Sequence, residues 1–352
     1  MRPGARKGRG ATCNPDVRYA EHAREAFDDG WGTLEGEPGP VPTRLFIDRA
    51  RRVIARNDSP DVPFRQSVNP YRGCEHGCVY CFARPTHAYL GHSPGLDFET
   101  LIYHKPDAPE RLREELARPG YRCSPIALGI NTDAYQPVER RTGLTRRIIE
   151  VLLDARHPFT IVTKSALVER DLDLLAEAAR QDLVHVMISL TTLDDDLARR
   201  LEPRAARPAR RLRALERLAE AGVPCGVLVA PVIPVLTDPE LERLLGAARE
   251  HGAQAAGYVL LRLPLELKEL VEDWLDHHRP GMKDHVLNRL REAHGGRLYD
   301  ARHGHRMRGA GPYAELIRQR FRLAHKRLGF GELPPLEVGR FRAPSDQLDL
   351  FS

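Results

Sequence analysis

Short apolar runs alternate with amphipathic stretches from Arg65 to Leu263, and this alternation restricts the fold more than any other feature of the 352-residue chain. In the amphipathic stretches, apolar residues recur every three or four positions, which is the period of a helix. Strands that alternate with helices indicate βαβ units and a parallel sheet. We therefore expect an α/β fold.

The apolar runs number about six, including a short one that precedes a group of cysteines. Six units are too few for a closed eight-unit barrel, so the pattern predicts a partial (β/α)6 TIM-like barrel. Strands are predicted around Gln66–Val68 and at Ile126–Ile130, Phe159–Val162, Val184–Leu190, Gly226–Val229 and Ala256–Leu261. Helices are predicted at Glu110–Ala117, Leu144–Asp154, Leu172–Gln181, Arg211–Ala221 and Glu240–His251.

The segments on either side of this region have a different character. Residues 1–42 are rich in Gly, Pro and charge, which indicates a poorly ordered tail, and the barrel is expected over residues 43–263. Residues 264–352 form a predicted helical extension with a basic tail, with helices at Leu265–His277, Lys283–His294 and Pro312–Arg327. No apolar run approaches the ~18–20 residues of a membrane helix and no secretory signal is evident, so we expect a cytoplasmic protein without membrane contact.

Three of the six cysteines lie on one loop, NPYRGCEHGCVYCFARPTH, which begins at Asn69. Cys74, Cys78 and Cys81 have the spacing C-x3-C-x2-C. Three thiolates can bind three irons of a [4Fe–4S] cubane and leave the fourth iron open to a ligand. Two alternatives remain: a zinc site completed by His76 or His87, and a ferredoxin-like electron carrier, which usually has four cysteines per cluster.

Polar side chains also follow the later predicted strands. Thr132 and Asp133 follow the second strand, Lys164 the third and Ser189 the fourth. Chemistry in such barrels collects at the carboxyl ends of the strands, so these residues are candidates to bind a cofactor. Helix N-capping is an alternative for Thr132, Ser189 and Thr191, and so is an Asx turn for Asp133 and a solvated position for Lys164.

The cysteine spacing, with an aromatic residue (Tyr80) before the last cysteine, resembles the radical S-adenosylmethionine (SAM) superfamily. That resemblance implies a [4Fe–4S] cluster whose open iron binds SAM. It also implies that an electron cleaves SAM to methionine and a 5′-deoxyadenosyl radical, which acts on a substrate. The electron is expected from a one-electron donor such as a flavodoxin or a ferredoxin.

The order of motifs over roughly residues 65–263 narrows this resemblance to the spore photoproduct lyase branch, including bacterial proteins often labelled DNA repair photolyase. The resemblance implies that Thr132 holds the SAM amino group and Lys164 the methionyl carboxylate. Ser189 would contact the ribose or the carboxylate, and Tyr80 would lie against the adenine. Apart from the resemblance, Asp133, Gln136 and Glu139 form a polar loop on the expected active face, and one of them could contact the SAM ammonium or the substrate.

One departure from the lyases concerns the hydrogen donor to the product radical. Ile130 stands where the lyases have a cysteine, three residues before Asp133. Cys123 and Cys225 precede or begin their strands, so we expect both at the opposite end of the barrel, in packing roles. The sequence therefore favours a different radical reaction on the same scaffold, with lyase-like DNA repair as the alternative.

Basic residues cluster in two places. Residues 279–342 hold 15 Lys and Arg against 6 Asp and Glu, and residues 199–213 hold seven Arg and one acid. Such patches make nucleic acid one candidate substrate, with a solvated surface as the plainer interpretation. Three further side chains carry open alternatives: Glu202 and Arg204 could pair with each other or reach SAM, and Arg262 could bind an anionic group or form a structural ion pair.

Overall fold

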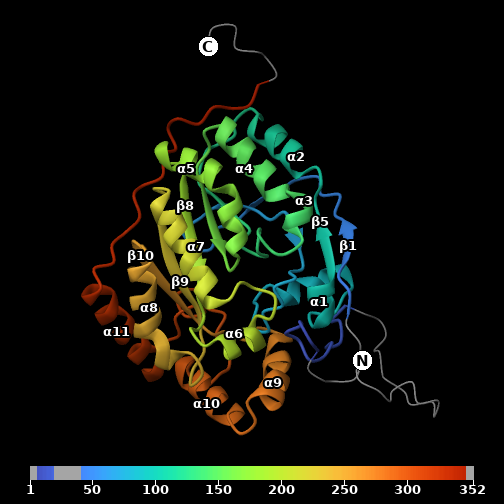
Figure 1. Cartoon of the computed structure of the whole chain (residues 1–352). Helices are drawn as coiled ribbons and strands as arrows, with labels where there is room; N and C mark the ends of the chain where they lie inside the picture. The colour runs from blue at the N-terminus through green and yellow to red at the C-terminus, as the bar shows by residue number, and fades with distance from the viewer. Residues whose placement is uncertain (1–5, 20–40, 346–352) are drawn as a thin grey trace, which may run out of the picture.

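A seven-stranded sheet with the order β10-β9-β8-β7-β6-β3-β2 forms the centre of the molecule (Figure 1). The computed structural model describes residues 6–19 and 41–345. The strands from β3 to β10 run parallel, and β2 pairs antiparallel with β3. The two edge strands, β10 and β2, do not pair with each other, so the barrel is partial. The strands are β2 (Ile54–Arg56), β3 (Gln66–Val68), β6 (Ile126–Leu128), β7 (Phe159–Thr163), β8 (Val184–Ser189), β9 (Cys225–Val232) and β10 (Ala255–Leu260).

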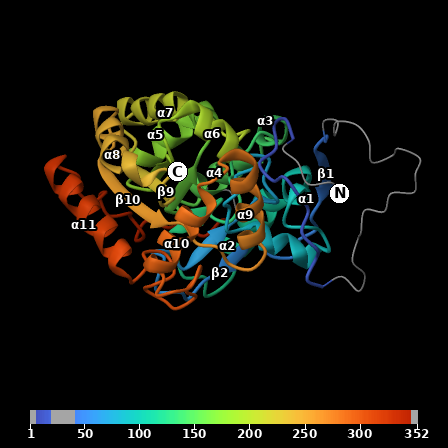
Figure 2. The same cartoon turned by 90° about the horizontal axis from the view of Figure 1, so that it is seen from below.

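Helices connect these parallel strands and cover the outer face of the sheet (Figures 1 and 2). Most residues of the central strands β6, β8 and β9 are buried, in agreement with their apolar sequences, whereas β10 at the edge is mostly half-buried. The predicted α/β fold is confirmed, and the predicted helices agree with the observed ones to within a few residues. The helices are α2 (Ala108–Leu116), α3 (Glu139–Thr142), α4 (Leu144–Asp154), α5 (Leu172–Arg180), α6 (Asp195–Leu201), α7 (Pro208–Glu220) and α8 (Leu241–Glu250), with short 3₁₀ turns η2 (Ala166–Asp171) and η3 (Asp238–Glu240).

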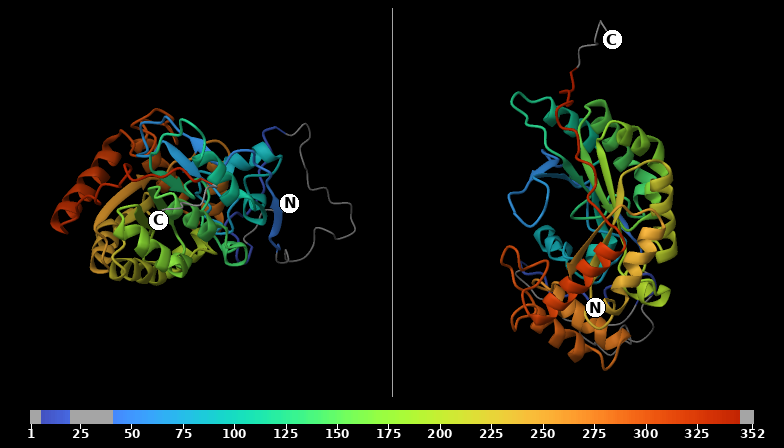
Figure 3. Two further views of the ribbon diagram at one scale, coloured as in Figure 1. Left: turned by 90° about the horizontal axis from the view of Figure 1, so that it is seen from above. Right: turned by 90° about the vertical axis from the view of Figure 1, so that its left-hand side faces the viewer.

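Three helices follow β10, as the sequence predicts: α9 (Leu267–His278), α10 (Lys283–Ala293) and α11 (Pro312–Arg327). The Trp274 indole donates a hydrogen bond to the Arg200 carbonyl at 3.0 Å, which joins α9 to the end of α6. α11 packs along α8, where Arg320 pairs with Glu242 (Figure 3). No helix within the described residues is long and apolar enough to cross a membrane.

A small sheet, β1-β5-β4, and the N-terminal segment lie outside the barrel and were not predicted. Residues 1–5 and 20–40 of the predicted tail, and 346–352 of the extension, lie outside the described residues. Residues 6–19, in contrast, pack between α9 and α1 (Figure 1). The added elements are β1 (Arg44–Ile47), β4 (Tyr71–Arg72), η1 (Arg84–Leu90), α1 (Leu96–Thr100) and β5 (Leu101–His104).

A buried histidine just before β7 makes part of the fold sensitive to acid. The ring of His157 is fully buried, with Nδ1 2.9 Å from the Pro158 carbonyl oxygen and Nε2 2.8 Å from the Tyr121 hydroxyl. Burial lowers the pKa of His157 from 6.5 to about 4. Between these two pH values the unfolded chain binds the proton and the folded chain does not. Stability is therefore lost as the pH falls through this window.

Replacing His157 with Gln, which does not titrate, should shrink the loss of unfolding free energy between pH 6.5 and pH 4 by up to about 3 kcal/mol. Urea unfolding of the metal-free protein at several pH values measures this difference. His285→Gln is the matched control, because His285 is exposed on α10. Equal pH slopes in wild type and His157→Gln would contradict the assignment.

Candidate functional site

The cysteine loop follows β3 and β4 at the carboxyl end of the sheet. Two glycines bend it with positive φ angles, Gly73 at +76° and Gly77 at +70°. A side chain at Gly73 would place its Cβ 2.9 Å from the Phe98 carbonyl oxygen, so only glycine fits this turn. The Cys74 N–H donates to the same carbonyl at 2.9 Å. The loop is therefore fixed by backbone contacts before any ligand is bound.

The three predicted ligands are free thiols. Cys74 and Cys78 are buried, and Cys81 is half-buried. Burial raises the pKa of all three, and for Cys74 the neighbouring Cys78 and Cys81 raise it further. The positive charge of a bound metal would favour the thiolate forms. The loop therefore keeps the three predicted thiols shielded from solvent and within electrostatic reach of one another.

A zinc site would need a fourth side chain beside the three thiols. Within residues 6–19 and 41–345, no group of three or more His, Cys, Asp and Glu side chains that could hold a metal ion is found, and this includes the three cysteines themselves. The two candidate fourth ligands differ in their contacts. His76 Nδ1 lies 3.3 Å from an Asp133 carboxylate oxygen. His87 packs among His92, Phe98 and Tyr103, and neither of its ring nitrogens has a hydrogen-bond partner among the described residues. A cubane spreads its irons over a wider span than one ion, and it needs only the three thiolates.

A fully buried ion pair anchors the loop from behind. The Arg84 guanidinium lies 2.5 Å from Glu99, and both side chains are inaccessible to solvent. Arg84 also donates to the carbonyl oxygens of Gly77 at 3.1 Å and Cys78 at 2.8 Å. Two more of its hydrogen bonds reach the carbonyls of Pro94 and Gly95. This one side chain therefore fixes the backbone around Cys78, the second cysteine.

The N-terminal segment completes the environment of Glu99. The Gly10 and Ala11 N–H groups donate to the two Glu99 carboxylate oxygens at 3.0 and 2.8 Å. A Cβ at Gly10 would lie 1.8 Å from the Gly77 carbonyl oxygen, so the segment passes too close to the loop for any other residue. This contact was not predicted from the sequence, because a short glycine-rich segment lacks the hydrophobic periodicity that identifies packed helices and strands.

Asp133 organises the ends of β6 and β7. Its carboxylate accepts the Thr163 hydroxyl and the Lys164 N–H, both at 2.8 Å, and contacts His76. It also accepts the Tyr135 N–H at 2.8 Å, so the Asx-turn interpretation is confirmed. Burial alone would raise the pKa of Asp133, but His76 and these hydrogen bonds outweigh it and lower the pKa. A contact with SAM stays a prediction.

Lys164 and Ser189, predicted to bind the cofactor, lie against each other. The Lys164 ammonium donates to the Ser189 hydroxyl and, at 3.1 Å, to the Ala230 carbonyl oxygen. It forms no ion pair with any described residue, and one of its three N–H donors remains available. The alternative of a solvated surface lysine is wrong. A lysine held only by neutral oxygens can still bind a carboxylate.

Tyr80 is buried beside this lysine. The Lys164 ammonium lies 5.8 Å from the centre of the Tyr80 ring. The Tyr80 hydroxyl donates to Glu202 and contacts the Thr191 hydroxyl at 3.1 Å. Glu202 in turn pairs with buried Arg211. Burial would raise the pKa of Glu202, but Arg211 and Lys164 outweigh it and lower the pKa to about 2, so the surroundings of Tyr80 include a fixed carboxylate.

The two threonines at the strand ends bind backbone carbonyl oxygens. Thr132 donates to the Tyr71 carbonyl at 2.8 Å, and Thr191 donates to the Ala230 carbonyl at 3.1 Å. Neither these threonines nor Ser189 caps a helix, because Asp194 caps α6 and no side chain caps α3. Glu202 and Arg204 do not pair with each other, since Arg204 pairs with Glu75 at 2.9 Å.

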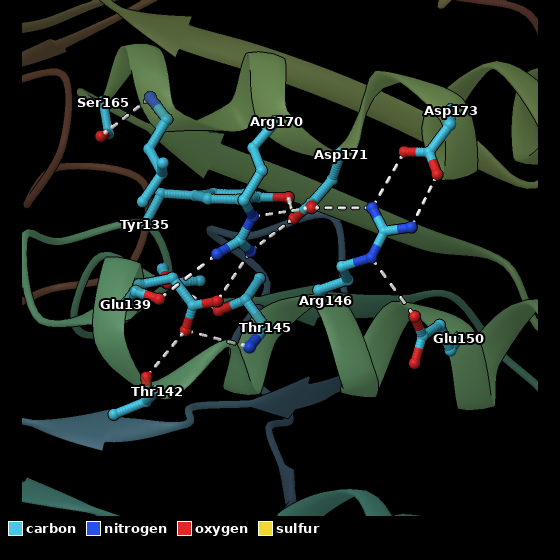
Figure 4. A network of polar contacts seen from close by, with 12 residues as sticks. Tyr135, Glu139, Thr142, Thr145, Arg146, Glu150, Ser165, Arg170, Asp171 and Asp173 are labelled. Atoms are coloured by element: carbon cyan, nitrogen blue, oxygen red, sulfur yellow. Dashed lines mark hydrogen bonds and ion pairs between the residues drawn. The ribbon is translucent and has the colours of Figure 1, made fainter.

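The polar loop after β6 holds neighbouring segments of the protein in place. Gln136 accepts the Glu75 N–H at 2.9 Å and donates to the Gly73 carbonyl at 3.1 Å, so it holds the cysteine loop from the other side. Glu139 is fully buried and belongs to a network with Arg170 and Asp171 (Figure 4). The interpretation of Glu139 as a residue of the active face is therefore wrong.

Arg262, after β10, lies 4.5 Å from the centre of the Phe82 ring, next to Cys81. No ion pair to Arg262 is found among the described residues, so its structural ion-pair interpretation is wrong. Cys123 and Cys225 lie at the amino ends of β6 and β9, away from the cysteine loop, as predicted. Cys225 is fully buried and packs there.

The sequence is similar to a known protein family and to proteins of other organisms. Residues 68–248 match the model of the radical SAM superfamily. An uncharacterized protein of Mycobacterium bovis is 42% identical over 233 residues, which cover 66% of this chain and 67% of that protein. An uncharacterized protein of Methanocaldococcus jannaschii is 28% identical over 173 residues, 49% of this chain and 62% of that protein.

Solved structures of spore photoproduct lyases share the fold. One, complexed with dinucleoside spore photoproduct, has a TM-score of 0.59 at 15% identity and covers 81% of this chain and 80% of its own. A variant with bound AdoMet and the same dinucleoside has a TM-score of 0.58 at 14% identity and covers 84% and 86%. At this identity the likeness establishes the fold alone.

Proposed function

Because the chain belongs to the radical SAM superfamily, we propose that it is an enzyme that cleaves SAM reductively and directs the resulting radical at a second molecule. The observation that carries this proposal is the cysteine loop, which holds three free thiols in the spacing C-x3-C-x2-C. Cys74, Cys78 and Cys81 would hold a [4Fe–4S] cluster, which would supply the electron for the cleavage of SAM to methionine and a 5′-deoxyadenosyl radical.

The chain's own residues orient SAM. Lys164 offers its free N–H to the methionyl carboxylate, and Ser189 lies beside it to contact the carboxylate or the ribose. Tyr80 presents a buried aromatic ring for the adenine. Thr132 lies in the loop after β6, where its hydroxyl oxygen would accept a hydrogen bond from the amino group while its hydroxyl hydrogen is donated to the Tyr71 carbonyl. These four residues come from the cysteine loop and three strand ends, which lie together at one end of the sheet.

A loop of the C-terminal extension closes the open side of the barrel. Asp61, beyond β2, accepts the Gly304 N–H at 2.6 Å and pairs with Arg306. On the opposite edge, the Leu260 N–H of β10 donates to the Met307 carbonyl at 2.8 Å. The loop thus bridges the two edge strands, and its role in the enzyme is to keep water away from a reactive radical.

Anaerobic reconstitution with iron and sulfide, followed by SAM and dithionite, tests this proposal. We expect about four iron atoms per chain, an absorbance shoulder that bleaches with dithionite, and release of 5′-deoxyadenosine. Binding of one zinc ion without sulfide, or a bleaching cluster that never cleaves SAM, would refute it.

Lys164→Met should weaken SAM binding by about ten- to a hundredfold, because a charge-assisted hydrogen bond to a carboxylate contributes roughly 1.5–3 kcal/mol. Equilibrium dialysis of the reconstituted protein with labelled SAM measures this. Lys326→Met, on the exposed surface of α11, removes the same charge elsewhere and should leave the affinity unchanged. Equal affinities in the two variants would remove Lys164 from the SAM site.

The fold of the spore photoproduct lyases favours a second candidate, reversal of a thymine photoproduct. We propose instead a different radical reaction, because Ile130 replaces the hydrogen-donating cysteine of those enzymes. Incubation of the active protein with dinucleoside spore photoproduct decides between the two. Formation of thymidine products at a rate matching SAM cleavage would establish the lyase activity and overturn our preference.

A further inference from the structure

An arginine-lined hollow lies on the surface next to the cysteine loop. Its volume is about 490 Å³, and its lining includes four arginines and a single carboxylate, Glu75. The charged lining residues are Arg9, Glu75, Arg140, Arg141 and Arg204. Tyr80, Lys164 and Ser189 do not line it. The hollow is therefore separate from the proposed SAM pocket.

The arginines of this hollow differ in whether they are already paired. Arg204 pairs with Glu75 at 2.9 Å, and Arg9 donates to the Glu99 carbonyl at 2.9 Å. Arg140 and Arg141 are exposed and form no ion pair with any residue in the described ranges. On the neighbouring helix, in contrast, Arg146 is bound by Asp171 and Asp173 (Figure 4). Two cations of the hollow are thus left for an external anionic partner.

The hollow lies close to the predicted cluster. Glu75 follows Cys74 directly in the chain, and its side chain lines the hollow. An electron that arrives here has one residue to pass before it reaches a predicted cluster ligand. A surface that meets an electron carrier should combine such proximity with a charge complementary to that of the carrier.

We propose that this hollow is the docking surface for an acidic one-electron carrier protein, a flavodoxin or ferredoxin with net negative charge. This proposal rests on the proposed function, since it assigns the surface at which that enzyme is reduced. The reduced centre of the carrier loses one electron and the cluster gains it, and no covalent bond forms or breaks. Arg140 and Arg141 contact the carboxylates that surround the carrier's redox centre.

Binding of an oxidised, acidic flavodoxin to the reconstituted protein tests this directly, because it does not depend on SAM cleavage. Affinity should fall as salt rises, and Arg140→Glu/Arg141→Glu should lower it at least about tenfold at low ionic strength. Arg118→Glu/Arg122→Glu is the matched control. Both of these arginines are exposed and precede the amino end of β6, whereas Arg140 and Arg141 follow its carboxyl end. The control should bind within about twofold of wild type.

A kinetic arm separates this proposal from the proposed function. With dithionite, which needs no docking surface, the Arg140→Glu/Arg141→Glu variant should release 5′-deoxyadenosine at the wild-type rate. With reduced flavodoxin at sub-saturating concentration, the variant should release 5′-deoxyadenosine more slowly, by the same factor as its loss of flavodoxin affinity. If wild type releases no 5′-deoxyadenosine with dithionite, the proposed function is refuted. The binding titration then still tests whether the hollow is a docking surface.

Three results would overturn the docking surface. The first is equal flavodoxin affinity in wild type and the Arg140→Glu/Arg141→Glu variant. The second is an equal loss in the control variant, which would show a non-specific charge effect. The third is a variant that loses affinity for a single-stranded oligonucleotide while its flavodoxin affinity is unchanged, which would make the hollow a nucleic-acid surface.

Discussion

Replacing any one of Cys74, Cys78 and Cys81 with alanine should reduce 5′-deoxyadenosine formation to background. Each thiol is free and lies on the same loop. Two thiolates leave a cubane with two open irons, which binds weakly and decomposes. Iron and sulfide content, the absorbance of the reduced and oxidised protein, and product release after SAM and dithionite measure the effect.

Cys123→Ala provides the matched control for these variants. Cys123 is half-buried and precedes β6, at the opposite end of the strand from the loop. It should retain the cluster and wild-type product release. A cysteine-loop variant that keeps full iron content and still cleaves SAM would contradict the assignment of that residue as a ligand. Loss of activity in Cys123→Ala would show that activity depends on cysteine content in general.

Arg84→Met should lower the unfolding free energy of the metal-free protein by about 3–5 kcal/mol. The substitution leaves Glu99 charged and buried without its cation, and it leaves four backbone carbonyls without their donor. Because two of those carbonyls belong to Gly77 and Cys78, iron incorporation should fall as well. Urea unfolding and iron analysis give the two readouts.

The double variant Arg84→Met/Glu99→Gln separates charge from packing. Removal of both charges should cost less than the sum of the single changes, because neither charge is then left unpaired. Arg111→Met is the control, since Arg111 pairs with Glu114 at the exposed surface and should cost less than about 1 kcal/mol. A loss below that level in Arg84→Met would show that the buried pair does not support the loop.

The alternation of apolar runs was sufficient to predict the main sheet. Leu144–Asp154 and Pro312–Arg327 agree with α4 and α11 at both ends, and the short strand Gln66–Val68 agrees with β3. These segments carry strong periodicity or clear boundaries, so local sequence and final packing agree. The positions of Lys164 and Ser189 follow from the same pattern, because consecutive parallel strands bring their carboxyl ends together.

Contacts between distant segments were not predictable from the sequence. Nothing in the local sequence of Gly10 or Glu99 indicates that they meet, and their contact spans 89 positions. The strands β1 and β5 are four residues each and pair outside the main sheet, so they carry too little alternation to be recognised. Glu139 looked like a site residue because an acid on a strand-end loop is polar whether it faces a ligand or a buried arginine.

The contact between the N-terminal segment and Glu99 affects how the protein can be shortened for experiments. The family match spans residues 68–248, and a version trimmed to those limits would seem to hold every cluster ligand. It would nevertheless lack Gly10 and Ala11, whose N–H groups donate to the Glu99 carboxylate. Glu99 in turn pairs with Arg84, which holds the Cys78 carbonyl. Poor cluster incorporation in a trimmed chain would then result from the loss of this segment and not from the cysteines. A fusion partner or a protease cut near the amino terminus would have the same effect.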